Sequence, residues 1–92
     1  MSSPGATAVP RIHPKARLTW DAVRGRDVLL YPEGLVALNA TGAEIVKLCD
    51  GVRSVADVAA VLQQRYGAAA IERDVSGFLD GLAAKGLVLF GP

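Results

Sequence analysis

The sequence predicts an α+β domain of winged-helix-like type, in which a three-stranded antiparallel sheet precedes a three-helix bundle. The first observation is a series of short apolar segments on tight turns between residues 17 and 38. The second is a change near residue 41, after which apolar residues recur at helical spacing. The third is the length of 92 residues, which suits one domain with one modest core. The predicted order is βββααα, with an optional short strand over residues 87–90.

The first fifteen residues, MSSPGATAVPRIHPK, contain Pro4, Pro10 and Pro14 among small residues. Prolines interrupt helices, and no apolar period runs through this segment. We therefore predict a disordered N-terminal arm over residues 1–15 and a single winged-helix-like domain over residues 16–92.

Three strands are predicted over residues 17–23, 27–31 and 35–38. The first alternates, with Leu18 and Trp20 on one face, whereas the other two are almost continuously apolar. The short turns between them require an antiparallel meander. An apolar strand such as LVAL is typical of a strand covered on both faces. Its second face is covered either by the arm and the last strand, or by another polypeptide that adds to the edge.

Three helices follow, each with a start or stop signal. Thr41 and Glu44 have capping-box spacing, and Asn39 is an alternative N-cap. Ser54 caps the second helix, and glycines end all three helices. The third helix is predicted over residues 71–85. One core is expected to contain the following side chains: Trp20, Leu48, Leu62, Phe78 and Leu82.

Gly77 and Gly81 lie one turn apart on the flank of the third helix's apolar stripe. Each costs about 1 kcal/mol relative to alanine in a helix interior. Their lack of side chains would allow another backbone to approach, although drift at an exposed position explains them equally well.

The sequence offers little for catalysis. It contains no nucleophile–base pair, paired-carboxylate motif, phosphate loop or metal-ligand spacing, so we expect a protein that is not an enzyme and binds no cofactor or metal. Cys49 is expected to be a buried structural thiol. A net charge of +1 and a third helix without a basic face argue against nucleic acid. No apolar run is long enough to span a membrane, and no apolar signal segment opens the chain, which favours the cytoplasm.

Three segments together resemble the PqqD family of pyrroloquinoline quinone biosynthesis: RLTWDAVRGRDVLLYPEG, LNATGAEIVKLCDG and DVSGFLDGLAAKGLV. The resemblance covers about residues 16–89. Gly42 is a departure, because alanine is expected there in such proteins.

The resemblance implies a peptide chaperone that binds the precursor peptide PqqA and presents it to the radical S-adenosylmethionine enzyme PqqE. It also implies a RiPP recognition element, in which the peptide joins the third strand and lies against the third helix. The implied peptide-binding residues are Gly34, Leu35, Val36, Ala37, Leu38, Asp74, Val75, Gly77, Phe78, Gly81 and Leu82. On this interpretation, proline at Val36 would remove an edge donor. The alternative is a structural or regulatory domain that closes its apolar surface by homodimerisation.

Overall fold

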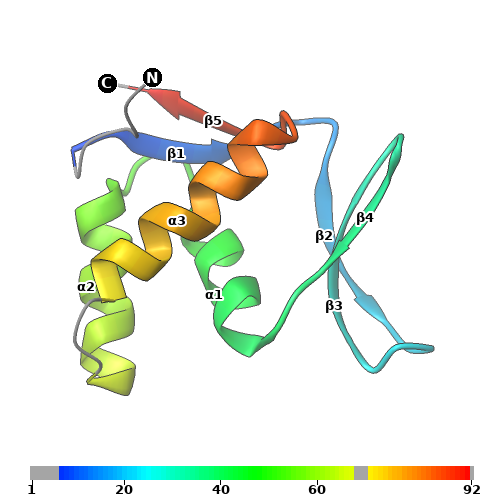
Figure 1. Ribbon diagram of the computed structural model, residues 1–92, viewed down its shortest axis with the longest axis horizontal. Helices are drawn as coiled ribbons and strands as arrows, with labels where there is room; N and C mark the ends of the chain where they lie inside the picture. Colours follow the sequence, from blue (N-terminus) through cyan, green and yellow to red (C-terminus); the bar gives the residue numbers. More distant parts are fainter. Residues whose placement is uncertain (1–6, 68–70, 92) are drawn as a thin grey trace.

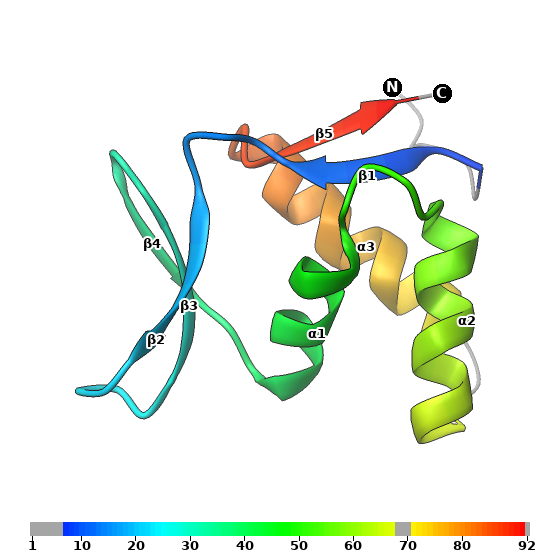
Figure 2. The same cartoon turned by 180° about the vertical axis from the view of Figure 1, so that it is seen from behind.

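The computed structural model describes residues 7–67 and 71–91. It confirms the α+β class and the βββααα order (Figures 1 and 2), and the optional last strand also forms. One further strand precedes the predicted ones. The elements are β1 (Val9–Ile12), β2 (Arg17–Asp21), β3 (Arg26–Tyr31), β4 (Gly34–Ala37), α1 (Ala40–Leu48), α2 (Val55–Tyr66), α3 (Ile71–Ala84) and β5 (Val88–Gly91).

Strands β2, β3 and β4 form an antiparallel sheet in that order. Cross-strand partners share a face of a sheet, so the register places Leu18, Leu29 and Val36 in one row. Leu29 is fully buried, and the other two pack against the same core. Because α1 contacts β2 and β3, this row lies on the face that the helices cover.

The predicted disordered arm is wrong for residues 7–15, while residues 1–6 lie outside the described part of the chain. Residues 9–12 form β1, which pairs antiparallel with β5. The other edge of β1 is also used, because the Gly51 amide donates to the Pro10 carbonyl at 3.3 Å and the Val55 amide to the Ala8 carbonyl at 2.9 Å. The strand that pairs with β1 lies at the far end of the chain, so no local sequence pattern predicts β1.

The pairing of β1 with β5 also decides how the larger sheet is covered. The two strands form a separate sheet across the ends of the helices (Figures 1 and 2). These two strands therefore do not cover the second face of β2, β3 and β4, although Pro14 and Lys15 of the predicted arm line a hollow together with Leu30 of that face.

The start of α1 follows the alternative signal. Asn39 is the N-cap, and its Oδ1 accepts the Gly42 amide at 2.7 Å. The Thr41–Glu44 capping box is therefore not the cap that forms. The short polar side chain of Asn39 provides the acceptor that a helix N-terminus needs.

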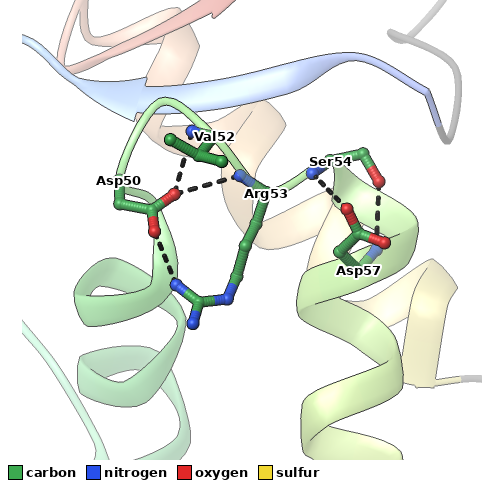
Figure 3. Close-up of polar contacts among 5 residues, drawn as sticks. All are labelled: Asp50, Val52, Arg53, Ser54 and Asp57. Carbon is green, nitrogen blue, oxygen red and sulfur yellow. Dashed lines mark hydrogen bonds and ion pairs between the residues drawn. The ribbon is translucent and has the colours of Figure 1, made fainter.

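The turn between α1 and α2 is held by two carboxylates (Figure 3). Asp50 accepts the amides of Val52 and Arg53 at 2.9 and 3.0 Å. Ser54 and Asp57 then form a reciprocal capping box at the start of α2. This start was predicted, as was the end of α2 at Gly67, which adopts the left-handed conformation.

The core lies between the three helices and one face of the sheet. Leu62 and Leu82 are buried there as expected, whereas Leu48 and Phe78 are half-buried at its margin. Trp20 is not a core residue, because 62% of it is exposed. Trp20 pairs with Asp27 near the hairpin turn. Strand alternation predicts which face of the sheet a side chain occupies, but it does not predict how far the helices extend along that face.

Candidate functional site

β4 is an edge strand, since it pairs with β3 and no other described strand lies beside it. The Leu38 amide donates to the Asp27 carbonyl at 3.0 Å. Main-chain groups alternate in direction along an antiparallel strand. Val36 therefore shares the phase of Leu38 and points toward β3, whereas the amides and carbonyls of Leu35 and Ala37 point away from the sheet.

This phase corrects one sequence-based expectation. Val36 is not an edge donor, so proline there would disturb the pairing with β3 and not the free edge. The outward groups belong to Leu35 and Ala37. Two residues in alternation provide two donors and two acceptors, which is the pattern a further strand requires.

The side chains of β4 explain why this strand is apolar throughout. Val36 packs against the core, while Leu35 and Ala37 lie on the opposite face with Val28 and Leu30. Gly34 begins the strand and is exposed. The strand is thus apolar toward the core and toward a second face that the helices leave uncovered.

α3 packs on α2 and β5, and two contacts bring residues of α3 or just after it near the ends of β4. The Phe78 ring lies against Gly42, just after the end of β4, where a β-carbon on Gly42 would be 3.1 Å from Phe78 Cε1. At the other end, Lys15 Nζ lies 4.0 Å from Glu33 Oε1 in the β3–β4 turn and 3.6 Å from the position of a Gly86 β-carbon.

These contacts place α3 and β4 in opposite chain directions, with Phe78 at one end of the space between them and Lys15 at the other. Figure 1 shows the same arrangement, with α3 rising toward β5 as β4 descends toward α1. Phe78 thus brings α3 near the C-terminal end of β4.

The expected residues of α3 divide into two sets. Asp74, Gly77 and Gly81 are exposed, and helical spacing places them on one face beside Phe78. A β-carbon at Gly77 or Gly81 would meet no described heavy atom within 4 Å. These positions border open space.

The remaining expected residues are buried. Val75 and Leu82 face the core from α3, and Leu38 is buried at the end of β4. Their side chains support the site from beneath and do not line its surface. Sequence analysis missed Lys15 entirely, and it noted Gly42 only as a departure from the family. No local pattern indicates that Lys15 lies against the end of α3.

Within residues 7–67 and 71–91, no group of three His, Cys, Asp or Glu side chains is placed to hold a metal ion. Burial, with a smaller effect from the Asp50 charge, raises the pKa of Cys49 to about 12. Because the thiolate is the reactive form, this 6% exposed thiol is a structural group at neutral pH. No described helix is long and apolar enough to cross a membrane.

Fold and edge together define the class: a small α+β domain with an open strand edge beside a glycine-containing helix face. The sequence model of the family described as Coenzyme PQQ synthesis protein D (PqqD) matches residues 26–88. The chain belongs to the PqqD family, as the resemblance indicated.

Curated relatives and a solved structure agree with this assignment. The PqqA binding protein of Pseudomonas aeruginosa is 40% identical over 87% of this chain and 88% of its own length. That of Methylococcus capsulatus is 36% identical over 84% of this chain and 83% of its own. The solution NMR structure of the PqqD truncation of Methylobacterium extorquens PqqCD superimposes with a TM-score of 0.80 and 37% identity, covering 96% of this chain and 95% of that one. That domain is described as a functional and stand-alone RiPP recognition element.

Proposed function

We propose that this chain is a peptide chaperone that binds a PqqA-type precursor peptide as an added strand on the free edge of β4. The observation that carries the proposal is the outward direction of the Leu35 and Ala37 main chain, beside the exposed face of α3. The names of the relatives, which are PqqA binding proteins, support it. So does the description of the solved neighbour as a RiPP recognition element.

The geometry predicts how such a peptide is recognised. Main-chain bonds to Leu35 and Ala37 supply sequence-independent affinity, and alternate side chains supply register. The peptide residue opposite Val36 points toward α3 and reaches Phe78. Its two neighbours, opposite Leu35 and Ala37, point to the other face of the sheet. The missing side chains of Gly77 and Gly81 leave room for the peptide backbone near α3.

In this proposal the chain contributes no catalytic group and needs no cofactor. It holds the peptide extended and presents it to the radical S-adenosylmethionine enzyme PqqE, which carries out the chemistry. We place this complex in the cytoplasm, where a ribosomally made peptide is released.

A proline at Ala37 tests the edge. Ala37 is exposed, and its amide points outward, so Ala37→Pro removes an edge donor and leaves the pairing with β3 intact. We expect peptide affinity to fall at least about tenfold, or about 1.4 kcal/mol, by isothermal titration calorimetry. Val36→Pro is the matched comparison and should lose stability as well as binding. A folded Ala37→Pro variant that binds the peptide as tightly as the parent would refute strand addition here.

Leucine at Gly77 or Gly81 tests the α3 face. Each substitution enters open space and should stabilise the helix by up to about 1 kcal/mol, yet crowd the bound peptide. We therefore expect higher stability together with weaker peptide binding. Arg73→Ala on the exposed polar face of α3 is the control. Unchanged peptide affinity in both leucine variants would indicate that the two glycines have no role in peptide binding.

Pairing of the β4 edges of two copies is the competing use of the same groups. Such a homodimer and the peptide would exclude one another, because each requires the outward groups of Leu35 and Ala37. Sedimentation at several protein concentrations, with and without peptide, distinguishes the two: a dimer of this kind should dissociate as peptide is added.

A further inference from the structure

A hollow of about 330 Å³ lies at the corner of the larger sheet where β2 begins and β3 ends. The residues that line it are Pro14, Lys15, Arg17, Leu30, Tyr31 and Pro32. Leu30 and Tyr31 are half-buried, whereas Lys15 and Arg17 are exposed. Two cationic side chains and a phenol thus share one small concave surface, and none of these described residues is acidic. Such a lining favours an anion as its ligand.

The turn that carries Lys15 is held in place by main-chain bonds. The His13 amide donates to the Leu87 carbonyl at 2.8 Å, and the His13 carbonyl accepts the Ala16 amide at 2.9 Å. The Lys15 amide donates to His13 Nδ1 at 3.0 Å. Pro14 restricts the backbone of the same turn. Because the turn is already ordered, a ligand that meets Lys15 need not order this backbone.

The two cations are weakly engaged within the protein. Lys15 Nζ lies 4.0 Å from Glu33 Oε1, which is longer than a hydrogen bond, and the Glu33 side chain is 69% exposed. Arg17 forms no ion pair with another residue in the described part of the chain. By contrast, Arg24 and Arg65 are each bound to a carboxylate, at 2.6 and 2.7 Å. The charges of Lys15 and Arg17 are therefore available to an incoming anion.

We propose that this hollow binds a carboxylate of the precursor peptide, on the flank that leaves the β4 edge beyond Gly34. The inference rests on the proposed function. Gly34 is the cross-strand partner of Tyr31, and a β-carbon on Gly34 would be 3.6 Å from the Tyr31 hydroxyl, so the hollow adjoins the first residue of β4. A peptide on β4 would lie three strand spacings from β2, about 14 Å. About four or five extended residues span that distance.

A charged contact at this place would fix the register of the peptide. Only Leu35 and Ala37 direct main-chain groups outward from β4, so a peptide that slips by two residues makes the same kind of hydrogen bonds. A carboxylate held by Lys15 and Arg17 distinguishes these registers, because only one of them brings the acid to the hollow. Carboxylates form their strongest hydrogen bonds with such cationic donors.

Neutral substitutions, Lys15→Gln with Arg17→Gln, test the proposal in the full chain. Two probes are titrated by calorimetry at about 0.05 M salt: a PqqA peptide, and the same peptide with every carboxyl group converted to an amide. We expect the double variant to bind the acidic peptide about fivefold more weakly than the parent does, and to bind the amide peptide equally well. Glu33→Gln removes the acid that competes for Lys15, so it should strengthen binding of the acidic peptide about twofold. Arg73→Gln on α3 is the matched control and should change neither affinity.

The other outcomes overturn the inference in different ways. Equal affinity of the parent chain for the two peptides means that the hollow takes no peptide carboxylate, and strand addition at β4 still stands. An equal loss for both peptides in the double variant means that Lys15 and Arg17 support the fold and not the ligand. A Glu33→Gln variant that binds the acidic peptide no more tightly than the parent removes Lys15 from the contact. A parent chain that binds neither peptide refutes the proposed function itself.

Discussion

The ring of Phe78 lies against Gly42 so closely that a β-carbon at residue 42 would be 3.1 Å from its Cε1 and 3.3 Å from its Cζ. This contact joins α3 to the first turn of α1, directly after β4. Residue 42, where the family resemblance led us to expect alanine, therefore lies under a residue of the proposed binding site. Glycine here allows the aromatic ring to approach the helix backbone.

The contact predicts non-additive substitutions. Gly42→Ala should leave stability nearly unchanged, because a helix-propensity gain of up to about 1 kcal/mol offsets crowding of the Phe78 ring. In a Phe78→Ala background the crowding is absent, so the same substitution should stabilise the protein. The Asn39 contact, also 3.1 Å from the added carbon, is common to both backgrounds. Urea unfolding of the four variants measures the coupling. Equal effects in both backgrounds would show that the ring does not constrain residue 42.

Core truncation should separate buried from exposed apolar residues. Leu62 is fully buried, so Leu62→Ala should cost about 2–5 kcal/mol of unfolding free energy. Leu82→Ala should fall in the same range, whereas Trp20→Ala should cost less than about 1 kcal/mol because the side chain is mostly in solvent. Chemical denaturation measures all three. A Trp20 variant as unstable as the Leu62 variant would contradict the exposed position of the indole.

Acid should loosen the link between α1 and α2. Glu44 accepts hydrogen bonds from Arg65 Nη1 at 2.7 Å and from the Tyr66 hydroxyl at 3.0 Å. The bond from Arg65 is the main cause that lowers the pKa of Glu44 below its ordinary value, and the bond from Tyr66 adds to it. The unfolded chain therefore binds this proton first as pH falls. The stabilisation is complete above about pH 4.3, the ordinary glutamate pKa, and is lost as pH falls through the lower folded value.

Unfolding free energies from pH 6 to pH 3 test this linkage. Glu44→Gln should be less stable than the parent near neutrality, and its stability should depend less steeply on pH. Some slope should persist, because hydrogen bonds from Arg24 and Arg53 also lower the pKa values of Asp21 and Asp50. Identical pH profiles of stability for parent and variant would mean that the pKa of Glu44 does not change on folding.

Removal of residues 1–12 should destabilise the whole domain. The deletion removes β1 and leaves β5 and the α1–α2 turn without their main-chain partners. We expect a lower midpoint of urea unfolding and protease cleavage within β5. Arg11→Ala, which keeps the β1 backbone, is the control. A deletion variant as stable as the parent would support the prediction that the folded domain begins at residue 16.

Elements with local signals could be predicted from the sequence. The strand alternation around Leu18, the cap at Ser54 and the glycine stop at Gly67 each depend on neighbours within a few residues, and each is confirmed. β1 depends on a strand at the other end of the chain, and the exposure of Trp20 depends on how far α1 extends along the sheet. Neither relationship produces a pattern in the neighbouring sequence.

In the candidate site, too, features with a local sequence signal could be predicted, and features that depend on packing between remote segments could not. The apolar character of residues 35–38 predicted an edge with two apolar faces, and family resemblance supplied the helix that faces it. Which amides point outward could not be predicted, because the phase depends on the Leu38–Asp27 hydrogen bond that fixes the register. The position of Lys15 near the end of α3 likewise depends on packing between segments that are remote in sequence.

The pairing of Val9 with Gly91 brings the two ends of the described chain side by side. In Figure 1 this closure lies across the molecule from β4. A carrier domain fused at either end would therefore leave the fold at the same place and keep its bulk away from the proposed peptide edge. Joining the two ends with a short linker and opening the chain at Glu33 should give a circular permutant with the same sheets, since Glu33 lies in an exposed turn.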